Sequence, residues 1–347
     1  MDVKKNLLMG LSTDKVQRIV SKSIDRKNIL GMVICLSKND EVATFAAGNM
    51  TENQQYFIAS VSKLYTSSIA FKLADNGTLK LDDRISKYLS EELIEDLHIY
   101  KGVDYSKEIT IRHLLSNTSG LPDYFEQKQS NGRILKNDLI RGVDVKLTFE
   151  DIIKLSKEMS SVFPPGKKGH AFYSDTNYQI LGQIIEKVSG SSMAEAYQKY
   201  IFDPLDLRQT YLYQDIEDGR PADLYYKNKV IRIPKIMSSF TSDGGIVSTA
   251  RENMTFLKAF FQGQLFSLHH FDEMYRWNRI FYPFKYGMGV ARFKFFGTYE
   301  LLGHPGASGS FAFYCPKKDA FITGTINQIH KPGLPYRSIL KILQTIK

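Results

Sequence analysis

The segments that resemble β-strands lie at the two ends of this 347-residue chain, and they constrain its fold more than any other feature. Near the start, Gly31–Leu36 and Val42–Ala47 are apolar runs separated by a short polar segment, which predicts a β-hairpin. Towards the other end, further runs rich in β-branched and aromatic residues cover Gly287–Phe293, Phe311–Cys315 and Phe321–Ile326. We therefore predict one antiparallel sheet built from both ends of the chain.

The middle of the chain, residues 78–240, reads as mostly helical. Helical periodicity is clearest in Asp151–Met159 and Tyr178–Val188. Because these helices separate the two groups of strands, we predict that 78–240 is an inserted helical domain. Residues 1–77 and 241–347 would together form a discontinuous sheet-plus-helix domain.

Helices are also predicted beside the strand segments themselves. Thr13 or Asp14 can cap an N-terminal helix, and a last helix is expected from about Tyr336 to the end. Another covers Ala250–Phe261. The predicted fold class is α+β: an antiparallel sheet flanked by N- and C-terminal helices, with an inserted, mainly helical domain.

The net charge of +9 and the sequence pI of about 9.2 raise the question of an acidic partner. The lysines and arginines are scattered, without a block of like charge, so no nucleic-acid partner is expected. No apolar run is long enough for a transmembrane helix, so stable membrane insertion is not expected either. Leu7–Leu11 is too short for the core of a signal peptide. The sequence therefore predicts a cytoplasmic protein, or an extracellular or cell-surface one if a leader has been removed.

The two cysteines, Cys35 and Cys315, lie in apolar, strand-like runs, where a free cysteine usually packs as a small hydrophobic side chain. They make neither a disulfide framework nor a zinc site. The seven histidines show no metal-ligand spacing. No metal and no other cofactor is expected, and the oligomeric state stays open.

Ser60 and Lys63 have the spacing of a nucleophile and its base. If a helix opens at Ala59-Ser60 and runs to about Asn76, the two side chains lie one turn apart on one face. A hydroxyl becomes a good nucleophile when a neighbouring base takes its proton, and a desolvated lysine can be that base. The same spacing occurs at Ser12/Lys15 and Ser338/Lys341. The competing interpretation is an N-capping serine followed by a solvent-facing lysine.

Tyr173 and Asp175 follow a Pro/Gly turn and precede a predicted helix. A tyrosine beside the Ser60/Lys63 pair could relay protons if the lysine charge lowered the pKa of its phenol. Asp175 could hold Lys63 through a charge-assisted hydrogen bond. The competing interpretation makes Tyr173 a core residue and Asp175 a helix cap.

A glycine-rich segment, 303–309, contains His304, Gly306 and Ala307 and leads into the Phe311 strand. Glycines allow a strand edge to approach a substrate closely, as a backbone oxyanion donor must. An ordinary β-turn is an equally good interpretation of this segment alone.

The order Ser-x-x-Lys, Tyr-Ser-Asp, His-x-Gly resembles that of the serine hydrolases of the class C β-lactamase, D-alanyl-D-alanine carboxypeptidase and related esterase group. Connecting stretches are similar too, at Arg112–Pro122, Asp243–Ala250 and Tyr286–Gly289. The resemblance runs from about Gly31 to Asn327. It implies a β-lactamase/transpeptidase-like fold, with the active site in the cleft between the sheet and the inserted helical domain.

The resemblance also implies roles for these residues. Ser60 would attack a carbonyl and form an acyl-enzyme, while Lys63 and Tyr173 share the acid and base work in an order that the sequence leaves open. The backbone N–H groups of Ser60 and Ala307, beside Gly306, would hold the oxyanion. His304 would line the cleft and help to place the substrate.

Two departures from the family pattern bear on the substrate. Asp175 stands where β-lactamases and carboxypeptidases of this group usually carry Asn, and a carboxylate cannot donate a hydrogen bond to a substrate carbonyl. It should also raise the pKa of Lys63, which shifts the role of base towards Tyr173. Pro305 replaces a hydroxyl residue that would contact a β-lactam carboxylate. Both departures favour an esterase or a D-amino-acid-directed peptidase or amidase.

Other interpretations stay open. Within the hydrolases, the expected small-molecule substrate is an ester, a D-alanyl compound or a β-lactam. From another class, the chain could be a penicillin-binding-like protein with little turnover. A weaker possibility is a triad of Ser60, His304 and Asp175. The aromatic residues of Phe281–Tyr286 are expected in the core, or alternatively in the wall of an apolar acyl pocket.

Overall fold

The computed structural model describes residues 7–8, 11–281, 283–295 and 299–346. Its largest sheet is antiparallel throughout and combines strands from both ends of the chain, as the sequence predicts. In spatial order the strands are β12 (Asn278–Phe281), β13 (Phe284–Tyr286), β14 (Ala291–Phe295), β15 (Tyr299–Pro305), β16 (Phe311–Cys315), β17 (Ala320–Thr325), β3 (Gly31–Lys38) and β4 (Glu41–Gly48).

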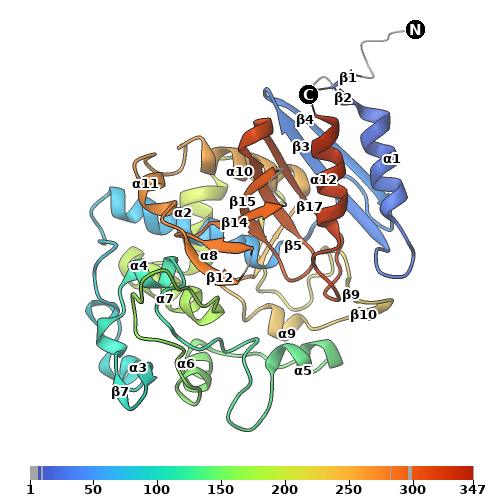
Figure 1. The fold of residues 1–347 in the computed structure, drawn as a ribbon. Helices are drawn as coiled ribbons and strands as arrows, with labels where there is room; N and C mark the ends of the chain where they lie inside the picture. Colours follow the sequence, from blue (N-terminus) through green and yellow to red (C-terminus); the bar gives the residue numbers. More distant parts are fainter. Residues whose placement is uncertain (1–6, 9–10, 282, 296–298, 347) are drawn as a thin grey trace.

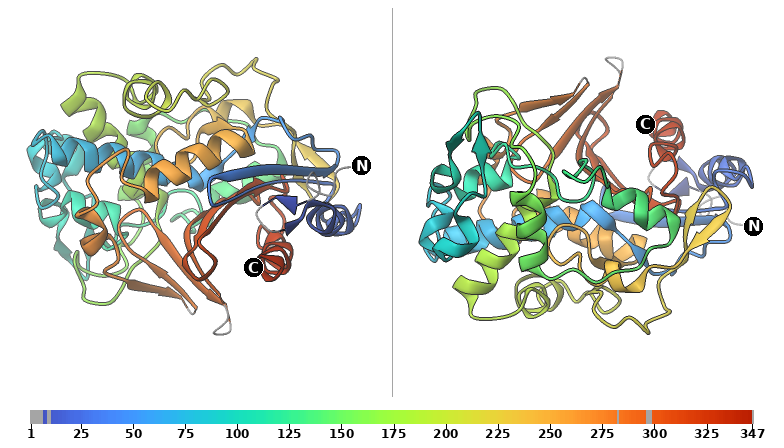
Figure 2. Two further views of the ribbon diagram at one scale, coloured as in Figure 1. Left: turned by 90° about the horizontal axis from the view of Figure 1, so that it is seen from above. Right: turned by 90° about the horizontal axis from the view of Figure 1, so that it is seen from below.

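Helices cover both faces of this sheet because β3 is apolar on both sides. Met32, Ile34 and Leu36 face α1 (Thr13–Ser23) and α12 (Pro335–Thr345), which pack side by side (Figure 1). Val33 and Cys35 point the opposite way, into the core that contains α2 (Ser62–Asp75) and α10 (Ala250–Phe261). Figure 2 shows α10 on the other side of the sheet from α1 and α12. Because successive side chains of a strand point to opposite faces, alternate residues of β3 pack against different helix layers.

The segment 78–240 carries most of the remaining helices, but long irregular stretches join them. The irregular backbone is fixed by buried side chains; for example, Ser174 and Thr176 both donate hydrogen bonds to the carbonyl of Pro122. The helices outside the two layers are α3 (Glu91–Ile94), α4 (Ile111–Leu115), α5 (Leu135–Arg141), α6 (Phe149–Lys157), α7 (Asp175–Ser189), α8 (Met193–Tyr197), α9 (Pro234–Met237) and α11 (His270–Met274).

Short strands complete the fold, and one small sheet joins distant parts of the chain in the order β5-β11-β8. The strands are β1 (Leu7–Leu8), β2 (Leu11–Ser12), β5 (Tyr56–Phe57), β6 (Ile99–Tyr100), β7 (Val103–Asp104), β8 (Tyr211–Leu212), β9 (Leu224–Tyr226), β10 (Lys229–Ile231) and β11 (Ile246–Ser248). Because β8 lies within 78–240 and β5 and β11 lie outside it, this sheet ties the predicted domains together. The domain boundaries themselves stay a prediction.

The strand predicted over Gly287–Phe293 is wrong in its first half. The chain turns there between β13 and β14, with Gly289 at a φ of +76°. Gly287 packs so tightly that an added Cβ would lie 1.8 Å from the carbonyl oxygen of Met274. The described residues contain no helix with the length and apolar character needed to cross a bilayer.

Candidate active site

Ser60 lies at the junction between strand β5 and helix α2. A 3₁₀ turn, Ala59–Val61, precedes the first α-helical residue, Ser62, so the α-helix begins slightly later than predicted. Ala59 has a φ of +48°, a left-handed conformation that costs energy for a residue with a Cβ. The turn leaves Ser60 partly exposed at the edge of a cavity while the helix behind it is buried.

Lys63 is fully buried, and its ammonium has three acceptors. Its Nζ lies 3.2 Å from Oγ of Ser60, 2.7 Å from the carbonyl oxygen of Asp243 and 2.6 Å from Oδ1 of Asp175. Burial by itself lowers the pKa of Lys63, but the nearby carboxylates, Asp175 foremost, outweigh burial and raise it above the usual range. Lys63 is therefore a cation that donates to the hydroxyl of Ser60.

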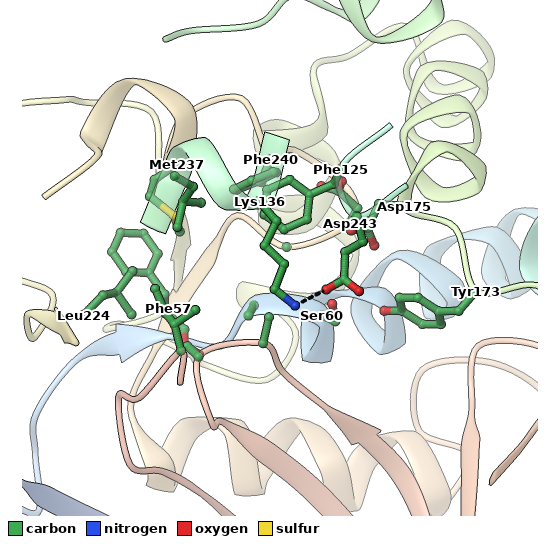
Figure 3. Close-up of a pocket in the computed structure, with 17 residues that line it drawn as sticks. Phe57, Ser60, Phe125, Lys136, Tyr173, Asp175, Leu224, Met237, Phe240 and Asp243 are labelled. Atoms are coloured by element: carbon green, nitrogen blue, oxygen red, sulfur yellow. Dashed lines mark hydrogen bonds and ion pairs between the residues drawn. The ribbon is translucent and has the colours of Figure 1, made fainter. Parts of the chain in front are cut away.

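Tyr173 faces the same pair. Figure 3 shows its hydroxyl pointing toward Ser60, and its ring centroid lies 5.1 Å from Nζ of Lys63. The hydroxyl is buried and has no hydrogen-bond partner among the described residues. Burial raises the pKa of this phenol well above its usual value, and the charge of Lys63 only partly offsets that effect. The condition for a proton relay, a phenol pKa lowered by the lysine, is therefore not met by the net effect, and Tyr173 is a neutral phenol.

Asp175 is the first residue of α7, and it belongs to a buried group of carboxyls. Its backbone N–H donates to Oδ1 of Asp123 at 3.0 Å. Asp243 accepts hydrogen bonds from Tyr124 and Gln179 at 2.8 and 2.9 Å. Burial, followed by the charge of Asp175, raises the pKa of Asp243 to about 7. Three carboxyls are thus buried near one another, and that of Asp175 contacts the Lys63 ammonium.

The sequence analysis missed Asp123, Tyr124 and Gln179 and used Asp243 only as part of a connecting stretch. A usable signal was present for Asp123, which directly follows the Gly-Leu-Pro turn of the Arg112–Pro122 stretch. Gln179 carries no such signal, because it reads as an ordinary polar position of a helix.

His304 lies on β15 and is only 1% exposed. Nδ1 lies 2.7 Å from the carbonyl oxygen of Pro305, so that nitrogen donates, and Nε2 accepts from the hydroxyl of Tyr286 at 3.1 Å. Burial, aided by the charge of Lys63, lowers the pKa of His304 to about 3. His304 therefore supports the cavity wall behind Tyr173 as a neutral ring, with both nitrogens occupied.

The turn after β15 is joined directly to the Ser60 turn. Ser308 and Ser310 donate hydrogen bonds to the carbonyls of Phe57 and Ile58 at 3.0 and 2.6 Å. Gly306 lies so close that an added Cβ would be 2.7 Å from the carbonyl oxygen of Ile58. The close approach predicted for the glycine segment is present, and Ala307 lines the same cavity as Ser60.

Two cavities meet at Ser60, Tyr173 and Ala307. The smaller is mainly apolar and includes Phe57, Phe125, Leu139, Leu224, Met237, Phe240 and Ile329 (Figure 3). The larger is lined by Phe281, Phe284 and Tyr286 with β14 and β15, so these aromatic residues do form a cavity wall. Tyr282, which belongs to the same predicted aromatic cluster, lies outside the described residues.

One group of potential metal ligands forms elsewhere in the described part of the chain, although the sequence shows no such spacing. Asp75, at the end of α2, lies beside His269 and His270. Nε2 of His270 is 2.9 Å from Oδ1 of Asp75, and its ring packs against Phe71. These contacts account for the buried histidine as part of the core.

Comparison with known proteins gives the family. The model of the family described as beta-lactamase matches residues 16–344. The chain therefore belongs to the β-lactamase family.

Named relatives match parts of the chain. It is 31% identical over 176 residues to penicillin-binding protein 4* of Bacillus subtilis, covering 49% of this chain and 34% of the relative. It is 27% identical over 227 residues to a teichoic acid D-alanine hydrolase of Staphylococcus aureus, covering 62% and 48%. The chain thus spans between a third and a half of the length of these relatives.

Solved structures confirm the β-lactamase/transpeptidase-like fold over nearly the whole chain. The D-amino acid amidase of Ochrobactrum anthropi SV3, complexed with D-phenylalanine, superposes with a TM-score of 0.80 at 22% identity, covering 96% of this chain and 98% of the amidase. EstCE1, described as a hydrolase with promiscuous acyltransferase activity, gives a TM-score of 0.78 at 21% identity, covering 96% and 97%.

Proposed function

We propose that this protein is a serine hydrolase that forms an acyl-enzyme on Ser60 with small esters or amides of amino-acid-like acids. The observation that carries the proposal is the contact of Ser60 with Lys63, whose charge is fixed by Asp175. An N-capping serine followed by a solvent-facing lysine would not bring a fully buried lysine into contact with a serine at the meeting point of two cavities. Membership of the β-lactamase family supports the same chemistry.

In this mechanism, the Lys63–Tyr173 pair first gives up one proton to solvent, because Lys63 starts as an ammonium and Tyr173 as a neutral phenol. Oγ of Ser60 then attacks the substrate carbonyl, and its proton passes to the pair. The backbone N–H groups of Ser60 and Ala307 hold the oxyanion, since the hydrogen bonds from Ser308 and Ser310 keep the two turns together. The pair returns the proton to the leaving oxygen or nitrogen. Water then attacks the acyl-enzyme and gives up a proton to the same pair, which passes it to Oγ of Ser60 as the acid is released.

The residues around Ser60 come from both predicted domains. Phe125, Lys136 and Tyr173 belong to 78–240, whereas Ser60 and Ala307 belong to the flanking segments. This supports the proposal that the active site lies in a cleft between the sheet and the inserted domain.

Two features favour ester and D-amino-acid chemistry over β-lactam hydrolysis. Asp175 offers a carboxylate where recognition of an acylamino carbonyl needs a donor, and Pro305 offers no hydroxyl. A similar relative is named a teichoic acid D-alanine hydrolase, and a similar structure a D-amino acid amidase. We therefore assign this chain to the esterase or D-amino-acid-directed branch.

The test is the intact mass of the protein over time after mixing with a p-nitrophenyl ester or, separately, a penicillin. Wild type should show a transient adduct with the ester and release nitrophenol over many turnovers, while Ser60→Ala does neither and remains folded by circular dichroism. Equal turnover in Ser60→Ala would refute the proposal. A stable penicillin adduct without ester turnover would instead indicate a penicillin-binding role, and rapid penicillin turnover a β-lactamase.

A further inference from the structure

Carboxylates dominate the charged groups around the two cavities. Asp123, Glu126, Asp175 and Asp243 all line one cavity or both. The cation shared by both cavities is Lys136, whereas Lys285 lines only the larger one and Lys63 is buried behind Ser60. Burial raises the pKa of Asp123 and Asp243, so the negative charge next to the nucleophile comes from Glu126 and Asp175, each in an ion pair with a lysine. A substrate group placed there meets these two carboxylates.

Lys136 already occupies part of this environment. Its Nζ lies 2.6 Å from Oε1 of Glu126, with the two side chains 30% and 49% exposed. Figure 3 shows Lys136 extending from α5 across the small cavity, its ammonium directed toward the space beside Ser60. Because both partners are solvent-accessible, their attraction is modest and can be exchanged for another ion pair. The position of the Lys136 ammonium beside Glu126 thus shows where the cavity can bind a cation.

Asp175 adds a second acceptor. It is 8% exposed and lines the small cavity; Oδ1 is occupied by Lys63, whereas Oδ2 accepts no hydrogen bond within the part of the chain that the structure describes. Oδ1 is the buried oxygen of this carboxylate and the side chain is 12% exposed, so Oδ2 is the oxygen that a substrate can reach. A neutral substrate would displace water from Oδ2 without replacing the hydrogen bond, which is costly. A substrate ammonium would supply one.

We propose that the site selects acyl donors with a free ammonium on the carbon next to the carbonyl. The substrate ammonium replaces that of Lys136 at Glu126 and faces Asp175, while a short apolar side chain enters the small cavity. The substrate class is therefore esters or amides of amino acids with an unblocked amine. N-acylated donors, including β-lactams with acylamino side chains, lack this charge. The inference rests on the proposed hydrolase function and refines its substrate.

The experiment compares the ethyl esters of D-alanine, N-acetyl-D-alanine and propanoic acid, followed by release of ethanol. The readout is the ratio of kcat/KM for the D-alanine ester to that for the propanoate ester. Wild type should give a ratio well above one and hydrolyse the N-acetyl ester poorly. Glu126→Gln should lower the ratio about tenfold, since one charge-assisted hydrogen bond is lost. Lys136→Met should raise it several-fold because the competing cation is gone.

If the ion pair were only structural, Glu126→Gln and Lys136→Met would change the kcat/KM ratio in the same direction. Changes in opposite directions therefore indicate that Glu126 recognises the substrate ammonium. The matched controls are Glu91→Gln and Lys107→Met, an exposed pair elsewhere with a 2.5 Å contact, and they should leave the ratio unchanged. If Ser60-dependent hydrolysis occurs without a preference for the ammonium, or if both pocket variants shift the ratio alike, the inference is wrong and the hydrolase stands. If wild type cleaves none of the esters faster than Ser60→Ala, the proposed function fails and the inference with it.

Discussion

Nζ of Lys63 lies 2.6 Å from Oδ1 of Asp175, with side chains that are 0% and 12% exposed. The contact replaces the lysine–amide pairing that the family pattern leads one to expect at this position. Because the carboxylate favours the ammonium, the first proton transfer from Ser60 must compete with a more firmly held proton on Lys63.

Replacing Asp175 by Asn should lower the pKa of Lys63. The amide removes a negative charge in contact with the ammonium, so neutral lysine forms at lower pH, by about one unit or more. The acidic limb of kcat/KM for an uncharged propanoate ester should shift to lower pH by a similar amount. A pH–rate profile from 6 to 10 measures this shift. An unchanged profile in a folded variant would mean that the proton on Lys63 does not control acylation.

His304 should make the fold sensitive to acid. Its pKa is lowered to about 3 by burial, whereas an unfolded histidine titrates near 6.5. Between these values the unfolded chain binds a proton that the folded protein does not, so stability is full above about pH 6.5 and declines as the pH falls toward 3. From pH 7 to pH 5 this group should contribute a loss of about 2 kcal/mol.

The measurement is urea unfolding at pH 7 and pH 5 for wild type and His304→Asn. Asn cannot become charged, so its loss between the two pH values should be smaller than that of wild type by about 2 kcal/mol. The other titrating groups affect both proteins alike and cancel. Equal losses would mean that His304 is protonated in the folded state at pH 5.

The parts of this structure that could be predicted from sequence are those set by local periodicity. The β3–β4 hairpin, β16 and α10 follow directly from alternating or helical apolar patterns, and Ser60, Lys63 and Tyr173 from short motifs. Strand β15 was missed because Glu300 and Gly303 interrupt its apolar run, although the strand is held by neighbours on both sides.

What could not be predicted depends on contacts between distant residues. Glu126 and Lys136 look like ordinary surface charges, and only the fold brings them over the cavity beside Ser60. The net rise in the pKa of Tyr173 could not be predicted either, because the motif shows the neighbouring lysine but not the burial of the phenol. Packing between residues that are distant in the sequence determines these positions and pKa values, and they cannot be predicted from a local sequence pattern.

Gly306 should tolerate no side chain. A Cβ there would lie 2.0 Å from Oγ of Ser310 and 2.7 Å from the carbonyl oxygen of Ile58, so Gly306→Ala must push the Ala307 turn away from Ser60. Losing the alignment of one oxyanion donor typically costs about 100-fold in kcat. The control is Gly219→Ala, where an added Cβ meets nothing within 4 Å. Steady-state kinetics on both variants measures the effect, and full activity of Gly306→Ala would exclude Ala307 as an oxyanion donor.

The backbone conformation of Ala59, which directly precedes Ser60, helps to position the nucleophile. Its φ of +48° is left-handed, which a β-branched side chain adopts only at substantial cost. Ala59→Val should therefore lose about 1–3 kcal/mol of unfolding free energy. Ala59→Gly should stay within about 1 kcal/mol of wild type, since relief of strain offsets the greater freedom of glycine in the unfolded chain. Urea denaturation compares both variants with Ala43→Val, a half-buried position in β4 where a β-branched residue is favoured. If Ala59→Val were as stable as Ala43→Val, the turn that presents Ser60 would be free to relax, and the left-handed residue would not be what fixes the serine in place.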